Sequence, residues 1–304
     1  GKVIVLAVIV FLGVVLLSFA YNKYQGHTNE TYTNMPYHIE LANTGSSHGV
    51  HGLDYTGLGY TTFNFALDSQ SMVYDYNLVH YYRDHFQENG VVLIVLSYFS
   101  FWGDEFADDM FEAKNRRYFA ILDQDHMRFK SEKEKYLSKY FSVAEIADNH
   151  IRTVFKTVEK EDSQVKNPQE GAEYSIEEVG ELRAKYHLTF MEEKGVLKPM
   201  VAENVMAVEH LITLCQDHKL QPVLITTPYL SYYNKWFDQD MKASFYKKIN
   251  GFVEKYQVPY WDYSADDRFA NSEKYFLDTD HLNEVGAKTF TSIVVEDLKE
   301  AGML

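Results

Sequence analysis

The sequence predicts an α/β protein whose core is a mostly parallel sheet with helices on both faces, a three-layer α/β/α arrangement. Two observations predict it. Short apolar runs rich in β-branched residues, such as 91–96 and 222–226, alternate along the chain with longer segments of helical pattern. Continuous apolar runs are also typical of strands buried on both faces of a parallel sheet. In such a sheet, ligands bind at the carboxyl ends of the strands.

The predicted elements alternate between strand and helix over most of the chain. In order they are strand 38–42, strand 60–66, helix 71–87, strand 91–96, helix 200–218, strand 222–226, helix 240–256, strand 258–261 and helix 283–299. Strands that are separated by helices pair in parallel through right-handed crossovers. The expected fold is therefore flavodoxin-like.

The composition changes between the strand at 91–96 and the later helices. From about 103 to 198 the residues are mostly charged and favour helix, with the clearest helix at 134–159 and a polar loop at 161–171. Because this segment interrupts the alternation, we interpret it as a helical insertion within one domain at 37–304.

The N-terminus predicts a membrane anchor at 1–21, followed by a polar linker at 22–36. Positions 3–20 are apolar except for Gly13 and Ser18, and as a helix they would nearly cross a hydrocarbon core of about 30 Å. The small residues Ser18 and Ala20 could instead mark the cleavage site of a signal peptide. Both interpretations place the remaining domain outside the cytoplasm, so we expect a single-pass protein of the cell membrane with its catalytic domain extracytoplasmic.

The net charge excludes one binding function, and the cysteine content excludes one kind of cross-link. The 29 Lys and Arg residues against 44 Asp and Glu give a formal charge of −15. This charge opposes attraction to phosphates, so nucleic-acid binding is excluded. Because Cys215 is the single cysteine, an intrachain disulfide is excluded, and its place in an apolar-periodic stretch predicts that it lies in the core.

A glycine-flanked serine follows the first predicted strand. Gly45 and Gly49 flank Ser47 in a turn, which leaves the serine hydroxyl at the carboxyl edge of the sheet with backbone amides free to donate. This placement suits a nucleophile. A tight turn that uses Gly and Ser for their backbone tolerance is the alternative.

A second motif lies in the loop that enters the last helix. Asp278 precedes His281 by three residues, so its carboxylate can hold the imidazole by the Nδ1 hydrogen and leave Nε2 for a serine hydroxyl. A helix cap made by Asp280 or Asn283 is the alternative. Because the serine and this pair lie at the first strand and before the last helix of one domain, together they predict a catalytic triad with Ser47.

These two motifs resemble the first and last blocks of the SGNH (GDSL-like) hydrolase and acyltransferase family. Residues 44–47 read Thr-Gly-Ser-Ser, and residues 278–281 read Asp-Thr-Asp-His, the closing Asp-x-x-His of the family. The resemblance covers about 37–300, apart from the insertion. It implies a serine esterase or O-acyltransferase that uses no cofactor.

Within the family, the anchor and the two blocks are similar to the membrane-anchored, extracytoplasmic DltD-like branch. That resemblance implies acyl transfer or ester hydrolysis on a cell-envelope glycan or a teichoic-acid-like polymer. It also implies an acyl donor carried across the bilayer, which makes an integral-membrane acyltransferase an expected partner.

Two further blocks of the family are imperfect in this chain. Ser69 stands where the family has a glycine, and we expect its amide to form the oxyanion hole together with the amide of Ser47. Residues 97–100 lack the asparagine of the family's Gly-x-Asn block. Because the loss of one oxyanion donor costs about two to three orders of magnitude in rate, this departure fits slow hydrolysis or a transferase that excludes water.

Three residues are candidates for a substrate pocket, namely His48, Phe99 and Trp102. The two aromatic residues follow the strand at 91–96 and could stack on a sugar or an acyl group, with core packing as the alternative. His48, His51 and Asp54 have a spacing that could ligate a metal. A solvated turn is preferred because no second ligand cluster accompanies them, so no metal is expected.

Two other interpretations remain. Residues 45–49 also satisfy the Gly-x-Ser-x-Gly elbow of α/β-hydrolases, but only one predicted strand precedes Ser47, and the acid and histidine of that fold normally come from separate loops. The other is a non-catalytic SGNH-like scaffold that binds an envelope polymer or a membrane acyltransferase. The missing asparagine favours the scaffold, and the retained Ser47, Asp278 and His281 oppose it.

Overall fold

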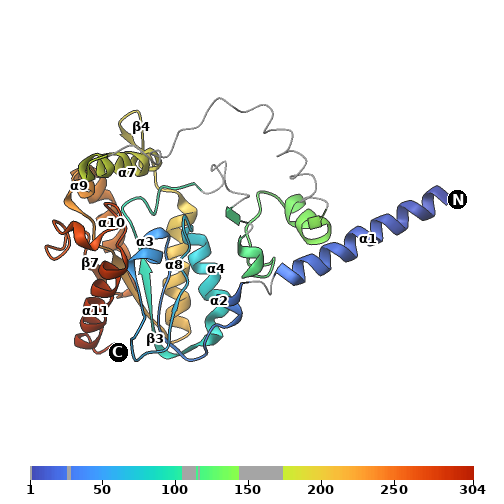
Figure 1. The fold of residues 1–304 in the computed structure, drawn as a ribbon, viewed down its shortest axis with the longest axis horizontal. Helices are drawn as coiled ribbons and strands as arrows, with labels where there is room; N and C mark the ends of the chain where they lie inside the picture. Colours follow the sequence, from blue (N-terminus) through green and yellow to red (C-terminus); the bar gives the residue numbers. More distant parts are fainter. Residues whose placement is uncertain (1, 26–28, 105–113, 116, 144–173) are drawn as a thin grey trace. The chain divides into compact units, whose positions relative to one another are not determined.

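The computed structural model describes residues 2–25, 29–104, 114–115, 117–143 and 174–304 (Figure 1). The chain divides into two compact units. One comprises 1–34 with 108–173, and the other comprises 35–107 with 174–304. The second unit contains the five-stranded sheet and the residues of the predicted triad.

The sheet is parallel throughout, with the strand order β2-β1-β3-β6-β7. Its strands are β1 (Ile39–Asn43), β2 (Thr62–Asn64), β3 (Phe86–Val95), β6 (Gln221–Thr226) and β7 (Tyr260–Asp262). After β1 the chain first adds β2 on one side and then β3 on the other. The order of the strands therefore reverses at β1, and the crevice at such a switch point is where parallel sheets bind ligands.

Helices cover both faces of this sheet. The main ones are α4 (Met72–Tyr82), α8 (Ala202–Asp217), α10 (Gln239–Tyr256) and α11 (Glu284–Glu300). Because side chains alternate along a strand, Val92 and Ile94 of β3 pack in the cluster formed with α4, α8 and α10, whereas Val91 and Val95 pack with α11. Figure 1 shows α4 and α8 next to each other over one face. The three-layer prediction is confirmed.

The predicted elements of the sheet domain are present, with shifted boundaries. The largest shift is at the helix predicted for 71–87. It ends at Tyr82, and β3 begins at Phe86, which pairs with Ile39 of β1. The early residues of β3 are polar and partly exposed, so they lack the apolar run that identifies its second half. Cys215 is buried in α8, as predicted, and burial raises the pKa of its thiol.

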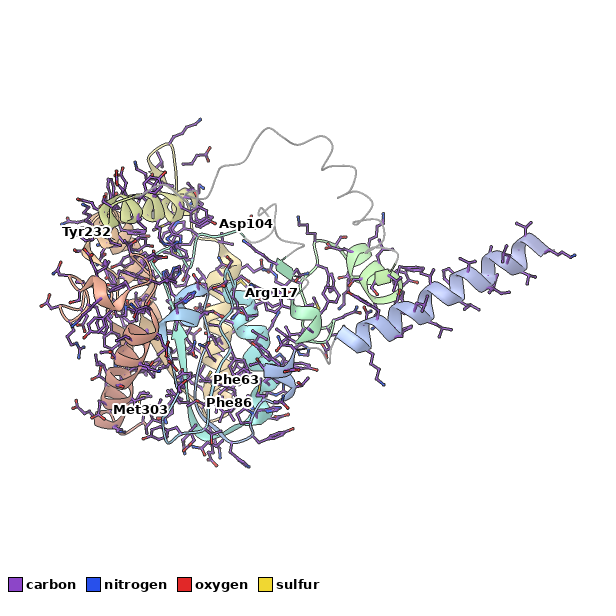
Figure 2. All side chains as sticks on the ribbon, viewed as in Figure 1. Phe63, Phe86, Asp104, Arg117, Tyr232 and Met303 are labelled. Carbon is purple, nitrogen blue, oxygen red and sulfur yellow. The ribbon has the colours of Figure 1, made fainter. Side chains whose placement is uncertain are left out.

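Residues of the predicted insertion fall in both units. Its last part, α7 (Ile176–Met191) and the hairpin of β4 (Glu192–Glu193) and β5 (Val196–Leu197), belongs to the unit that holds the sheet. Gly180 lets α7 lie close to Tyr232 of α9 (Ser231–Asn234), since a Cβ there would come within 2.8 Å of the Tyr232 carbonyl oxygen. Tyr232 is labelled in Figure 2. Of the helix predicted at 134–159, residues 132–143 are helical, and the remainder lies outside the described residues, as does the loop at 161–171.

The smaller unit contains the N-terminal helix α1 (Lys2–Gln25). Its segment Lys2–Lys23 has a mean hydropathy of 3.2 and is long and apolar enough to cross a membrane, consistent with an anchor or a signal sequence. The helical residues 132–143 pack against α1. Asn22 donates to the carbonyl oxygens of Ser138 and Lys139 at 3.2 and 3.1 Å. The short helix α2 (Glu30–Thr33) ends this part of the unit.

Candidate active site

The three residues of the predicted triad meet at the carboxyl edge of the sheet. Ser47 Oγ lies 2.8 Å from His281 Nε2, and His281 Nδ1 lies 2.9 Å from Asp278 Oδ2. Both distances are those of good hydrogen bonds. With the proton on Nδ1, the imidazole donates to the carboxylate and its Nε2 accepts from the serine hydroxyl, which is the arrangement of a general base.

Ser47 is positioned by a sharp change from strand to helix. It is the first residue of α3 (Ser47–Gly52), four residues after β1 ends, so the turn between strand and helix is shorter than predicted. Gly45 has a φ of 125°, and a Cβ there would lie 2.9 Å from the Cβ of Val95. Only glycine fits this conformation without strain. Since Ser47 begins a helix, its amide has no acceptor within the helix.

The spacing of Asp278 and His281 follows from a local turn. The Oδ1 of Asp278 accepts the backbone amides of Asp280 at 3.0 Å and of His281 at 2.9 Å, which leaves Oδ2 for the imidazole. The capping role belongs to Asn283, whose side chain accepts the amide of Gly286 at 2.9 Å. Both aspartates are therefore available to the site.

A second, buried network lies beside the triad. His48 is 1% exposed, and its Nε2 donates to Asp280 Oδ2 at 3.0 Å. Its Nδ1 lies 2.6 Å from the hydroxyl of Ser97, which donates to it. Both ring nitrogens of His48 are thus occupied by protein groups. His48, predicted as a pocket residue, is therefore buried behind the triad, where it holds Asp280 and Ser97.

Electrostatic contacts keep both aspartates ionised. Burial opposes the ionisation of Asp278, but the hydrogen bond from His281 and the charge of Arg183 hold its pKa below the ordinary value. Burial also opposes the ionisation of Asp280, and hydrogen bonds from His48 and Arg183 hold its pKa well below that value. Burial lowers the pKa of His48, so this ring is neutral near pH 7.

Sequence reasoning missed two residues that α7 brings to the site. Arg183 contacts Asp280 through Nε and, at 3.0 Å, through Nη2. His187, one turn later, accepts from or donates to the Tyr233 hydroxyl at 2.7 Å, and burial lowers the pKa of His187 to about 3. The small residues Gly180 and Ala184 on the same face of α7 were the available signal, because small residues at helical spacing indicate close packing.

The remaining predicted site residues, one oxyanion candidate and two aromatic pocket candidates, lie in a loop, against a histidine and in the core. Ser69 is exposed in the loop after β2 with a φ of 54°, the left-handed conformation that glycine adopts most easily. Leu67 ties this loop to the nucleophile turn by donating its amide to the Gly45 carbonyl at 3.3 Å. Phe99 stacks on His187 with ring centroids 4.1 Å apart. Trp102 lies in the core, 3% exposed, because it packs with the strand residues and donates to a backbone carbonyl.

The three residues with metal-like spacing do not converge. His48 is turned toward Asp280, whereas Asp54 accepts the amide of Thr56 at 2.9 Å. His51 lies beside the triad, with its ring centroid 5.0 Å from that of His281. Ligand atoms of His48, Asp280 and His281 do lie within 4.8 Å of one another. Asp280, however, already accepts from Arg183 and His48, and both nitrogens of His281 contact protein groups, so these ligand atoms already have partners within the protein.

A buried carboxyl group supports the nucleophile turn from α4. The Oδ1 of Asp75 accepts the Gly45 amide at 2.9 Å and the Gln70 side chain at 2.6 Å. Burial raises the pKa of Asp75 from its ordinary 3.8 to about 7, although both hydrogen bonds oppose the rise. The folded protein therefore holds a proton here that the unfolded chain releases above about pH 4.

Asp75→Asn is expected to remove a pH dependence of stability. Because the pKa of Asp75 is raised in the folded state, its protonated carboxyl contributes its full stabilisation of the fold below about pH 4. This contribution, roughly 4 kcal/mol at most, is lost as the pH rises to about 7. The variant should therefore gain stability over wild type between pH 5 and pH 8 in thermal or urea unfolding. Asp68→Asn, at an exposed carboxylate, is the control. A difference in stability between Asp75→Asn and wild type that stays constant from pH 5 to pH 8 would contradict a raised pKa at Asp75.

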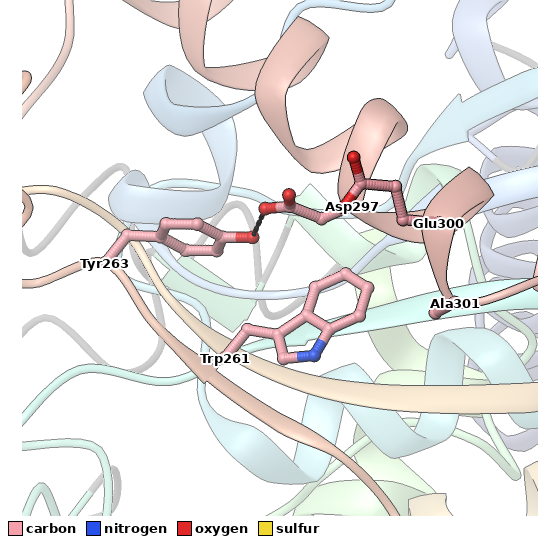
Figure 3. A pocket seen from close by; sticks show the side chains of 5 residues that line it. All are labelled: Trp261, Tyr263, Asp297, Glu300 and Ala301. Carbon is pink, nitrogen blue, oxygen red and sulfur yellow. Dashed lines mark hydrogen bonds between the residues drawn. The ribbon is translucent and has the colours of Figure 1, made fainter.

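A cleft of about 370 Å³ lies on the β7 and α11 side of the unit (Figure 3). It is lined by Trp261, Tyr263, Asp297, Glu300 and Ala301. Within it, the Tyr263 hydroxyl donates to Asp297 at 2.5 Å. No triad residue lines this cleft, so it is not the place where a substrate would meet Ser47.

Comparison with known proteins gives fold-level similarity only. The sequence matches no protein-family model and no curated protein. Several solved structures are similar, including two from Bacteroides species. One is a candidate acylhydrolase from Bacteroides fragilis NCTC 9343, with 9% identity and a TM-score of 0.40, covering 91% of this chain and 97% of that chain. The other is a GDSL-like lipase from Bacteroides thetaiotaomicron VPI-5482, with 9% identity and a TM-score of 0.36, covering 86% and 88%.

Proposed function

We propose that this chain is a serine esterase or O-acyltransferase of the SGNH type, in which Ser47 carries the acyl group. The observation that supports it is the continuous hydrogen-bonded series from Ser47 through His281 to Asp278, with distances of 2.8 and 2.9 Å. A hydroxyl, an imidazole and a carboxylate in this order are what nucleophilic catalysis by serine requires.

The proposed reaction has two steps. His281 takes the proton of Ser47 as Oγ attacks an ester carbonyl, and it returns that proton to the alcohol that leaves. Water or a glycan hydroxyl then gives its proton to His281 and takes the acyl group. As the bond between the acyl carbon and Oγ breaks, His281 returns that proton to Ser47. The amides of Ser47 and Ser69 are the proposed oxyanion donors, and the φ of 54° at Ser69 supports its place in the role of the family's glycine.

The proposed setting is the outer face of a cell membrane. The membrane-length helix α1 supports a retained anchor. We propose a DltD-like role in which the substrate is a cell-envelope glycan or a teichoic-acid-like polymer. Because an acyl donor outside the cytoplasm must cross the bilayer, the proposed partner is an integral-membrane acyltransferase that delivers it.

Mass spectrometry of the full chain tests this proposal. The protein is incubated with p-nitrophenyl acetate and with a D-alanyl ester, quenched in acid and digested. We expect an acyl adduct on the peptide that contains Ser47. Faster loss of that adduct with an added glycan than with water alone would identify a transferase, and equal loss would identify a hydrolase. No adduct with any ester at any quench time would contradict acyl chemistry at this site.

A second candidate function is a non-catalytic scaffold that binds an envelope polymer or a membrane acyltransferase. One observation favours it. Residues 97–100 lack the asparagine oxyanion donor of the family's block, and Phe99 in this stretch stacks on His187. A scaffold would bind its polymer equally well in wild type and Ser47→Ala, without any acyl adduct, and this separates it from the first candidate.

A further inference from the structure

One guanidinium on α7 faces both carboxylates beside the nucleophile's base and the base itself. Arg183 contacts both oxygens of Asp280, a side chain with no exposed surface. Its Nε also lies 3.4 Å from Asp278 Oδ2, and its Nη2 lies 3.1 Å from His281 Nδ1. The two-point contact with Asp280 fixes the plane of the guanidinium. Arg183 is therefore held in place beside the catalytic imidazole.

The charges around His281 require such a cation. Asp278 and Asp280 are both ionised, and the neutral His48 brings no charge to offset them. His51 of α3 also faces the imidazole, and burial lowers its pKa. Two carboxylates beside one imidazole, without a cation, favour protonation of one of the three groups. With Arg183 in place, the two negative charges and one positive charge leave a single net negative charge.

The contact with Nδ1 adds a second constraint. A guanidinium can only donate, so an Arg183 that donated to Nδ1 of His281 would place the imidazole proton on Nε2, toward the hydroxyl of Ser47. In that tautomer the imidazole cannot accept the serine proton. Asp280 accepts from Nε and Nη2 and competes for these hydrogens, while Asp278 Oδ2 lies 2.9 Å from Nδ1 as the acceptor for its proton.

We propose that Arg183 and Asp280 form a positioning pair for the acyl-transfer site, which makes α7 part of the catalytic unit. Arg183 neutralises Asp280, so that Asp278 alone presents a negative charge to the imidazole. Asp280 in turn accepts from Nε and Nη2 of Arg183 and so competes with Nδ1 of His281 for the guanidinium hydrogens. This inference rests on the proposed function, because it assigns a role toward the base of that reaction.

The test compares charge-removing variants by their rate of reaction with a fluorophosphonate probe. Arg183→Met is expected to slow labelling by roughly 100-fold, because it leaves Asp280 buried without its cation. Adding Asp280→Asn to that variant removes the uncompensated charge and should restore at least about tenfold. Lys185→Gln is the matched control. It removes a cation from the same helix, and the lysine side chain is 59% exposed and paired with Glu181.

A spectroscopic measurement separates positioning from folding. The ¹⁵N shifts of the His281 ring should show a neutral Nδ1–H imidazole in wild type and a changed tautomer or charge in Arg183→Met. Circular dichroism checks that the variant is folded. If Arg183→Met is unfolded, Arg183→Lys keeps the charge but loses the two-point contact, and we expect intermediate labelling with a changed ring spectrum.

The outcomes distinguish this inference from the proposed function. A wild type that never reacts with the probe contradicts the function, and the ring spectra still test Arg183. A reactive wild type with an equally reactive Arg183→Met and an unchanged ring spectrum overturns the inference. Slow labelling that Asp280→Asn does not relieve, with an unchanged spectrum, also overturns it, since that pattern shows only a packing role for Arg183.

Discussion

Ser47→Ala is expected to abolish labelling by a fluorophosphonate probe, and His281→Ala to slow it by at least about 10³-fold. The first change removes the hydroxyl oxygen that would accept the phosphonyl group beside His281. The second removes the base that lies 2.8 Å from that atom. Fluorescence of the labelled band after a time course, with equal protein loaded, measures both rates.

Ser46→Ala is the matched control for these two variants. Ser46 is the neighbouring serine and precedes the first turn of α3, but its side chain makes no capping hydrogen bond. We therefore expect this variant to fold and to label at nearly the wild-type rate. Labelling that persists in Ser47→Ala would assign the reactive group to another residue. A wild-type rate in His281→Ala would show that this imidazole is not the base.

Local patterns were enough to predict the sheet and the alternation of its strands and helices along the chain. Strands such as β6 are buried along their length, so their apolar runs identify them without any tertiary information. The first half of β3 was missed because residues 87–89 are polar and partly exposed. The strand starts at Phe86 through its pairing with Ile39 of β1, which a local pattern does not show. Whether α7 packs on the sheet unit depends on its partners, which the helical pattern alone does not contain.

The same distinction applies to the site. Ser47 and the Asp278 and His281 pair were predicted because each motif is set by its own short segment, a strand-to-helix turn and an aspartate-centred turn. Arg183 approaches Asp280 from 97 residues away, and no local pattern encodes that contact. His48 was assigned to a pocket because a sequence does not show which way a helix residue points once its helix is docked.

Asp278→Asn is expected to slow probe labelling by about 10² to 10⁴-fold while leaving the turn intact. The amide oxygen of asparagine can still accept the backbone amides of residues 280 and 281, as Oδ1 does in wild type. Its NH2 group, however, faces Nδ1 of His281 in place of Oδ2. That group donates to Nδ1 and places the imidazole proton on Nε2, so the ring cannot accept the proton of Ser47.

Asp266→Asn provides a comparison for this substitution, because Asp266 also accepts a backbone amide two residues later, from Arg268 at 2.9 Å, and lies outside the site. It should label like wild type. Since the pKa of Asp278 is held below its ordinary value, the carboxylate stays ionised from about pH 5 to 8. The ratio of wild-type to Asp278→Asn rates should therefore remain large throughout this range. A ratio near one at every pH would show that the imidazole does not depend on this carboxylate, and that the buried Asp280 with its arginine orients the base instead.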